Sequence, residues 1–177
     1  MESSISSATT LPSPTLLGVL SDTHDRADAA AAGIATLRAA GAQFLIHCGD
    51  VGGEAILDLL AGNPCAFVWG NTDYDRASLN RYAAEIGLQA GGDFVDLEFG
   101  GKKIAVTHGD NPKLIRKAMA EDPRYDYLFL GHSHIPCDQR VGRLRIVNPG
   151  ALHRTAKKTV ALIDLSGDVV RHLDVRI

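Results

Sequence analysis

The chain has 177 residues, of which 45% are hydrophobic and 22% are charged, so it is long enough to form one compact domain with its own core. Its formal charge of -3 excludes a broad basic surface that would hold a long nucleic acid along its backbone, although a short phosphate-containing ligand is compatible with it. The cysteines Cys48, Cys65 and Cys137 have no CxxC spacing, and we predict reduced thiols in a cytoplasmic protein.

The first fifteen residues differ in composition from the rest of the chain. They are rich in Ser, Thr and Pro, and they have neither the basic start nor the apolar centre of a secretory signal. No stretch of the sequence approaches the ~20 apolar residues of a membrane-spanning helix. We therefore predict a flexible tail over residues 1–15, a domain over residues 16–177 and no membrane partner.

From Leu16 onward, short apolar runs alternate with segments of helical spacing, which is the pattern of parallel βαβ units. The apolar runs are nearly continuous, as expected for strands that are covered on both faces. The elements predicted in this half are strands over 16–21, 43–48 and 65–69 and helices over 25–40, 53–61 and 76–86.

The second half of the sequence indicates antiparallel pairing, because Gly100-Gly101 joins strands predicted over 94–99 and 102–107 in a two-residue hairpin. A helix over 112–120, a strand over 127–130 and two further strand pairs follow, one around Gly142 and one around Ser166-Gly167. Both halves fit an α/β fold in which two mixed β-sheets pack face to face and helices cover the outside.

Side chains that bind metals follow the predicted strands in both halves of the chain. They are Asp22, His24, Asp50, Asn71, His108, His132 and His134. Loops at the carboxyl ends of strands in open α/β sheets face one crevice, so we expect these side chains to converge. Because a single zinc site takes about four ligands, this number predicts two adjacent divalent cations.

Asp50 is the predicted bridge between the two cations. A metal pair ~3.5–4 Å apart needs a carboxylate whose two oxygens can be shared, and Asp50 lies in a glycine-rich turn before a predicted helix. His132 and His134 are two residues apart in an extended segment, so they point the same way and can serve neighbouring metals.

Together these residues resemble the calcineurin-like metallophosphoesterases, in particular their small YfcE-type members. The motifs that carry the resemblance occur in order between Leu16 and the C-terminus. They are Asp22-Thr23-His24, Gly49-Asp50, Gly70-Asn71, Thr107-His108-Gly109, Gly131-His132-Ser133-His134 and Asn148-Pro149-Gly150. The resemblance implies a four-layer sandwich. It also implies that Asp22, His24 and His134 bind the first metal, that Asn71, His108 and His132 bind the second, and that Asp50 bridges them. Manganese is expected, with nickel, iron, cobalt or zinc as alternatives.

The predicted reaction is hydrolysis of a small phosphate ester by in-line attack of a hydroxide held between the two cations, with Asp50, Asn71 and His108 as catalytic residues. Thr72 follows Asn71 where many phosphatases of the superfamily carry a histidine, and a threonine hydroxyl is a poor general acid. The small members of the family also lack that histidine and tend to act on phosphodiesters, so the resemblance implies a phosphodiester substrate. A monoesterase or nucleotide pyrophosphatase would share the metal site, and a non-catalytic scaffold like the Vps29 subunit of retromer is the other alternative, although such a scaffold would be expected to lose ligand histidines and none is lost here.

Each candidate ligand also has a structural alternative, since Asp and His can cap helices or form satisfied buried groups, Asn71 can form an Asx turn and His108 can cap a helix. Several other polar residues have expected roles near the site. His47 is expected to support the second strand, Asn148 to hold its turn and His172 to lie on a strand surface. Asp73 is an alternative candidate to orient a water or ligand, and His153 is a minor candidate to approach the site. Arg143, Arg145, Arg154, Lys157 and Lys158 are expected to form a solvated face or a rim for a larger substrate.

Overall fold

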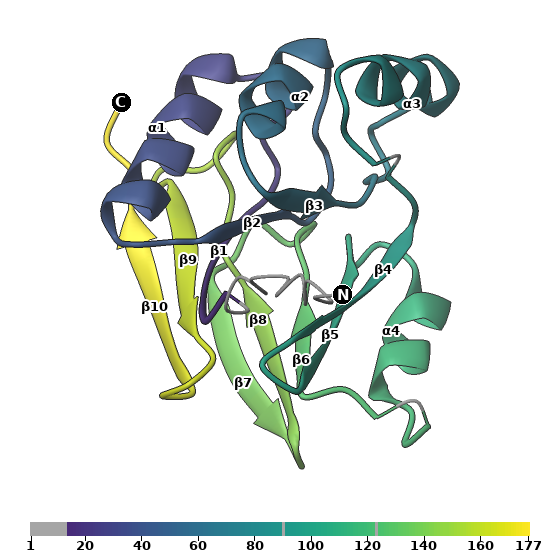
Figure 1. The fold of residues 1–177 in the computed structure, drawn as a ribbon, viewed down its shortest axis with the longest axis vertical. Helices are drawn as coiled ribbons and strands as arrows, with labels where there is room; N and C mark the ends of the chain where they lie inside the picture. Colours follow the sequence, from purple (N-terminus) through teal and green to yellow (C-terminus); the bar gives the residue numbers. More distant parts are fainter. Residues whose placement is uncertain (1–13, 90, 123) are drawn as a thin grey trace, which may run out of the picture.

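The computed structural model describes residues 14–89, 91–122 and 124–177 (Figure 1). Most of the tail predicted over residues 1–15 lies outside these ranges. Thr15 is its last residue, and its backbone N–H donates to Oε1 of Gln43 at 2.8 Å while its carbonyl accepts the N–H of Leu165. Among the helices in the described ranges, none has both the length and the apolar character needed to cross a membrane.

The first sheet has the spatial order β10-β9-β1-β2-β3. Its strands are β1 (Leu16–Leu20), β2 (Phe44–His47), β3 (Cys65–Phe67), β9 (Thr159–Asp164) and β10 (Val169–Asp174). β1, β2 and β3 are parallel and are joined by α1 (Ala27–Ala39) and α2 (Glu54–Ala61), so the predicted βαβ units are confirmed. β9 pairs antiparallel with both β1 and β10, so the C-terminal hairpin makes this sheet mixed.

The second sheet has the spatial order β4-β5-β6-β8-β7. Its strands are β4 (Phe94–Phe99), β5 (Lys102–Thr107), β6 (Tyr127–Phe129), β7 (Cys137–Val141) and β8 (Leu144–Asn148). The hairpins β4–β5 and β7–β8 are antiparallel as predicted, but β5, β6 and β8 are parallel. The parallel pairing of β5 with β6 follows from α4 (Pro112–Met119), which crosses over between them.

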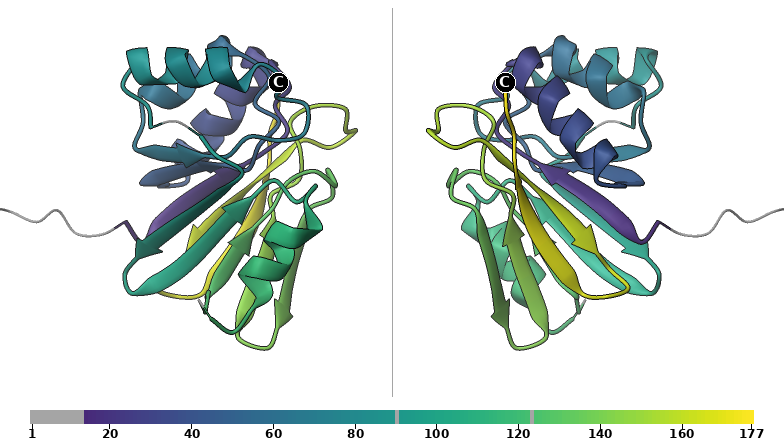
Figure 2. Two further views of the ribbon diagram at one scale, coloured as in Figure 1. Left: turned by 90° about the vertical axis from the view of Figure 1, so that its right-hand side faces the viewer. Right: turned by 90° about the vertical axis from the view of Figure 1, so that its left-hand side faces the viewer.

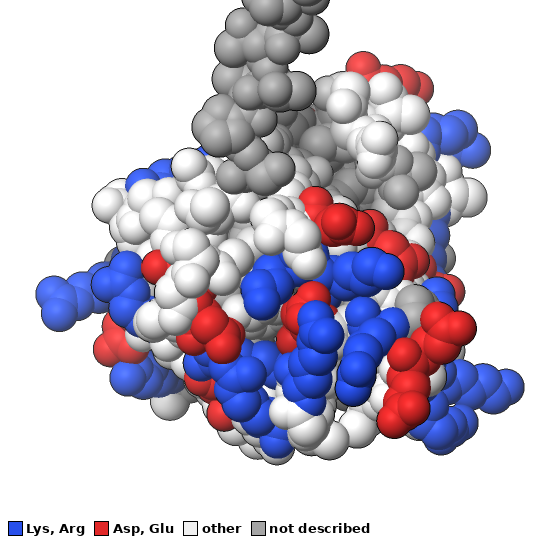
Figure 3. All heavy atoms as spheres, turned by 60° about the horizontal axis from the view of Figure 1, so that its bottom comes forward, with Lys and Arg blue, Asp and Glu red and all other residues white. Residues whose placement is uncertain are grey.

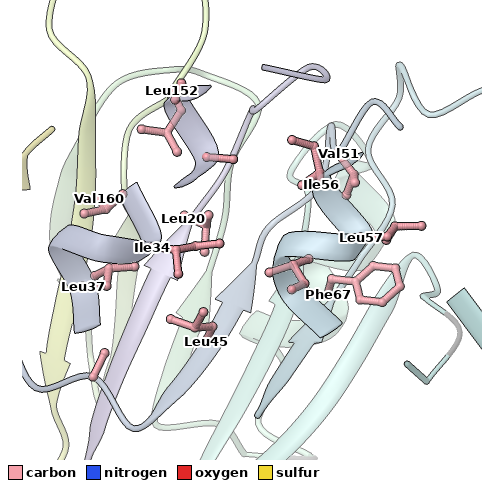
Figure 4. Packing of buried hydrophobic residues seen from close by; sticks show 14 of the residues in the cluster. Leu20, Ile34, Leu37, Leu45, Val51, Ile56, Leu57, Phe67, Leu152 and Val160 are labelled. Atoms are coloured by element: carbon pink, nitrogen blue, oxygen red, sulfur yellow. The ribbon is translucent and has the colours of Figure 1, made fainter. Parts of the chain in front are cut away.

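The two sheets pack face to face, with α1, α2 and α3 (Arg76–Glu85) outside the first sheet and α4 outside the second (Figure 2). The side-chain alternation of β1 accounts for these layers. Leu17 and Val19 pack between the sheets in the same cluster as Phe129, whereas Leu20 packs with Leu37 under the helices (Figure 4). The four-layer sandwich is therefore confirmed.

The start of α1 differs from the prediction. The helix begins at Ala27 and not at residue 25, because Asp25 has a φ of 61°, which is left-handed, and Arg26 is the N-cap residue. The backbone N–H of Asp25 donates to the carbonyl of Val51 at 3.0 Å. The loop after β1 is thus tied to the loop after β2 before the helix starts.

Candidate metal centre

The loops after β1, β2, β3, β5 and β6 bring the predicted ligands to one edge of the sandwich. Nε2 of His134 lies 3.1 Å from Oδ1 of Asp22. Oδ2 of Asp50 lies 3.5 Å from Nε2 of His24 and 3.4 Å from Nε2 of His108. Asp50 therefore lies between two histidines that come from different sheets, which is the position expected of a shared ligand.

Two groups of donor atoms can each hold a cation. Asp22, His24 and His134 form one group and Asp22, Asp50 and His108 form the other, with the donor atoms of each group within 4.8 Å of one another. Asp22 belongs to both groups. The membership of Asp22 in both groups was not predicted from the sequence, because it depends on how the loop after β1 lies against the loop after β2.

Asn71 and His132 lie beside the second group. Oδ1 of Asn71 lies 3.1 Å from Nε2 of His108 and 3.0 Å from Nδ1 of His132. Nδ1 of His108 lies 2.8 Å from the carbonyl of Cys48, which fixes the ring so that Nε2 faces Asn71 and Asp50. All the predicted ligand side chains are thus brought together.

Two buried atoms show that this donor set fits divalent cations. Oδ1 of Asp22 and Nε2 of His24 form no hydrogen bond within the part of the chain that the structure describes, although Nε2 of His134 lies 3.1 Å from the first atom and Oδ2 of Asp50 lies 3.5 Å from the second. A buried carboxylate oxygen or imidazole nitrogen without a partner is costly, and a cation supplies the missing partner to both. Burial raises the pKa of Asp22, and the contacts with Ser21, His108 and His134 offset that effect only in part.

Asp50 has the opposite electrostatic environment. Burial acts to raise its pKa, but the hydrogen bonds from His108 and from the backbone N–H of Thr72 outweigh burial and hold the pKa well below its usual range. The Thr72 N–H donates to Oδ1 of Asp50 at 2.9 Å. Asp50 is therefore ionised and oriented, with Oδ2 directed at His24 and His108.

Left-handed backbone is concentrated in the ligand loops, and it was not predicted from the sequence. The non-glycine ligands with positive φ are Asp22 (55°), His24 (44°), Asp50 (53°), His132 (65°) and His134 (59°). Each such residue costs on the order of 1–3 kcal/mol and persists only where the surrounding structure holds it. The fold thus stabilises an unfavourable backbone in order to direct these side chains into one site.

His47 supports the loops of the site and does not point into the site. It is fully buried, its Nδ1 accepts the N–H of Gly49 at 3.2 Å, and its Nε2 lies 2.9 Å from Oγ1 of Thr23. This pattern implies that Nε2 carries the proton and donates to Thr23, whose hydroxyl donates to the carbonyl of Val51 at 2.9 Å. Thr23 and His47 therefore join the loops that carry the two aspartates.

We expect His47 to make stability depend on pH. Burial lowers its pKa to about 3, so below the unfolded value of about 6.5 only the unfolded state binds the proton. The free energy of unfolding then falls by roughly 1.4 kcal/mol per pH unit as the pH decreases from 6.5 toward 3. Urea unfolding at about pH 7 and pH 5.5 measures this effect. The free energy of unfolding of the wild type should fall by about 1 kcal/mol more than that of His47→Gln, because the other histidines contribute equally to both proteins. An equal loss in both proteins would contradict this role.

Asp73 has a structural role, which corrects the expectation that it orients a water or ligand. Its carboxylate accepts the backbone N–H groups of Val51 at 3.2 Å, Gly52 at 2.8 Å and Gly70 at 2.8 Å. These bonds tie the loop of Asn71 to the loop of Asp50. An aspartate that binds backbone N–H groups is common in turns, but its distant partners cannot be read from local sequence.

The remaining polar expectations have mixed outcomes. Nδ2 of Asn148 donates to the carbonyl of Gly131 at 2.6 Å, so Asn148 holds the loop of His132 as expected. The His153 ring approaches the site, with its centroid 5.1 Å from that of His24. His172 does more than lie on a strand surface, because its Nε2 is 2.8 Å from the Asn148 carbonyl.

The arginines Arg143 and Arg145 of the predicted basic cluster are paired with acidic residues. Arg143 pairs with Asp126 at 2.6 Å, and Arg145 pairs with Asp138 at 2.8 Å and with Asp168 at 2.9 Å. Arg145 is largely buried between its partners. The expectation that Arg145 belongs to a solvated face is therefore wrong. Figure 3 shows acidic and basic side chains interleaved on this end of the molecule. This end is therefore an ion-pair network and not a free basic rim.

Comparison with known proteins agrees with this geometry. Residues 16–168 match the calcineurin-like phosphoesterase superfamily domain. The chain is 27% identical over 154 residues to the phosphodiesterase MJ0936 of Methanocaldococcus jannaschii, covering 84% of this chain and 92% of that protein. The structure of an archaeal phosphodiesterase superposes with a TM-score of 0.80 at 24% identity, covering 90% and 99% of the two chains. The Zn²⁺ complex of Vps29 from Entamoeba histolytica has the same fold, with a TM-score of 0.60 at 18% identity, covering 90% and 98%.

Proposed function

The chain belongs to the calcineurin-like phosphoesterase superfamily, whose members are hydrolases of phosphoric esters, and we propose that it is a two-metal phosphodiesterase acting on a small phosphodiester. The observation that carries the proposal is the pair of donor groups that share Asp22, with Asp50 beside a histidine of each group and two buried donor atoms that form no hydrogen bond with the described residues.

The residues divide between two cation positions. Asp22, His24 and His134 would hold one cation, Asn71, His108 and His132 would hold the other, and Asp50 would contact both. Cations bound there lower the pKa of water and neutralise charge on the phosphoryl oxygens. The mixed oxygen and nitrogen donor set suits manganese and also accepts other first-row metals.

The chain's own groups bind and orient the phosphoryl group. With two divalent cations bound, the two aspartates leave a local charge of about +2, which attracts a phosphate ester to an otherwise acidic protein. Oδ1 of Asn71 faces His108 and His132, whereas its Nδ2 forms no hydrogen bond with any described residue. Nδ2 is therefore available to donate to a phosphoryl oxygen.

Thr72 disfavours substrates with a basic leaving group, and the relative named a phosphodiesterase supports a diester substrate. Oγ1 of Thr72 lies 3.4 Å from Nδ1 of His24, so a hydroxyl occupies the edge of the site beside the candidate ligands. A threonine hydroxyl does not protonate a basic alkoxide at neutral pH, and general acid catalysis typically contributes 10²- to 10⁴-fold. Alkyl monoesters, whose leaving group needs that proton, are therefore poor substrates in this proposal.

We expect Thr72→His to raise kcat/KM for an alkyl monoester such as glycerol phosphate by about tenfold or more, because an imidazole can donate the missing proton. The assay measures phosphate release after removal of metals with a chelator and restoration of Mn²⁺, and it runs in parallel with bis(p-nitrophenyl) phosphate. Thr72→Gln is the control, since it adds bulk without a titrating group. A wild-type protein that prefers the alkyl monoester to the diester would contradict the substrate assignment.

A further inference from the structure

An open pocket of 340 Å³ lies directly beside His132. Most of its wall is apolar and comes from Leu130, Ile135, Cys137 and Ile146. Ile135 is 66% exposed, whereas the other three side chains are partly buried. A large exposed isoleucine over a preformed apolar hollow is typical of a binding surface.

The pocket is continuous with the metal centre. Gly109 follows His108, Gly131 precedes His132, and both glycines line the pocket together with His132 itself. Ser133 and Asn148 also line it, and their side chains are hydrogen bonded to each other at 3.1 Å. Because His132 belongs to both the pocket wall and the candidate metal ligands, a group attached to a phosphoryl unit at the metal centre would lie next to this pocket.

The strand pairing locates this apolar surface on the second sheet. Ile146 pairs with Gln139 on β7, which is the edge strand of the second sheet, so both side chains lie on the same face. On that face, Ala118 of α4 packs in a cluster with Leu144. The hollow lies on this face beside Ile146 and reaches the edge strand β7, whose Cys137 and Gln139 also line it.

We propose that this pocket binds one ester arm of the substrate, and that the arm is an aromatic or branched apolar group. The inference rests on the proposed phosphodiesterase function, because a diester has two arms and the metal centre takes only the phosphoryl group. The volume is at the lower end of the range of about 300–1,000 Å³ for ligand pockets, which suits one ring and not a long chain. Ser133 and Gln139 supply the few polar groups that would orient such an arm.

The test uses phosphonates, whose P–C bond is not hydrolysed, so that binding is measured without turnover. Titration calorimetry on the Mn²⁺-loaded protein compares phenylphosphonate with methylphosphonate. We expect phenylphosphonate to bind at least about tenfold more tightly, since burial of one aromatic ring supplies that order of affinity. Equal affinity of the two phosphonates for the wild type would overturn the inference.

Two variants test the location of the preference. Gln139→Trp fills the pocket from an exposed position on β7, and Ile135→Gln makes its wall polar. Each variant should therefore reduce the affinity ratio of phenylphosphonate to methylphosphonate to between about one and a few. Val169→Trp is the matched control, because Val169 is also exposed on an edge strand, β10, and should leave the ratio unchanged. Retention of the full ratio in both pocket variants would contradict the assignment.

The phosphonate result is separable from the proposed activity. Selective binding of phenylphosphonate by a protein that hydrolyses no diester would support the pocket and contradict the phosphodiesterase proposal. Diester hydrolysis without any phenyl preference would support the phosphodiesterase proposal and overturn the pocket inference.

Discussion

Asp50→Asn is expected to lower kcat/KM for a phosphodiester by about 10³-fold or more, because the loss of a shared carboxylate removes several kcal/mol of electrostatic stabilisation. Asp50 has a φ of 53°, and asparagine tolerates this left-handed conformation better than most residues. The asparagine Oδ1 can still accept the N–H of Thr72. The variant should therefore fold, and its defect should come from the lost charge and the lost Oδ2 acceptor.

Asp25→Asn is the matched control for this variant. Asp25 also has left-handed backbone, with a φ of 61°, and it lies close to the site, but it is exposed and belongs to neither donor group. The kcat/KM of Asp25→Asn should stay within about twofold of the wild-type value, as expected for the substitution of an exposed residue outside the donor groups. Full activity of Asp50→Asn in steady-state assays with Mn²⁺ would exclude a role for Asp50 as a shared ligand.

Gly70→Ala should have the second largest effect. A Cβ at Gly70 would lie 2.1 Å from Oδ1 and 2.3 Å from the backbone nitrogen of Asp50, and a backbone atom cannot move aside cheaply. We expect Asp50 to be displaced, the free energy of unfolding to fall by about 1–3 kcal/mol, and metal affinity to fall by at least about tenfold. Urea unfolding and Mn²⁺ titration measure the two effects.

Gly62→Ala serves as the comparison for Gly70→Ala. Gly62 has a φ of -74°, and an added Cβ there meets no atom within 4 Å. This substitution should be neutral or should stabilise the protein by up to about 1 kcal/mol, since it restricts the unfolded chain. If the two variants bound Mn²⁺ equally well, the close contact between Gly70 and Asp50 would not position the site.

The layers of the fold and the convergence of the ligands could be predicted from the sequence. Nearly continuous apolar runs separated by helical segments predict parallel strands, and the Gly100-Gly101 pair predicts a hairpin, because both are local patterns. The position of the ligands then follows from the rule that loops at the carboxyl ends of strands share one edge.

Features that depend on non-local pairing were not predictable. The placement of β9 beside β1 and the parallel pairing of β6 with β8 join segments that are distant in the chain. The three backbone N–H groups that bind Asp73 lie in the loops after the paired strands β2 and β3, and the contact of His172 on β10 with the Asn148 carbonyl on β8 joins the two sheets. Local periodicity records which residues are buried, but it does not record which distant segment lies next to them.

The number of Mn²⁺ ions bound per chain tests the central claim most directly. Metal-free protein is titrated with Mn²⁺, passed through a desalting column, and analysed for metal and protein. Two ions per chain in the wild type and fewer in Asp50→Asn are the predicted results, because the two donor groups share Asp22, and Asp50 lies beside a histidine of each group. A wild-type protein that binds one ion or none would contradict the two-metal centre.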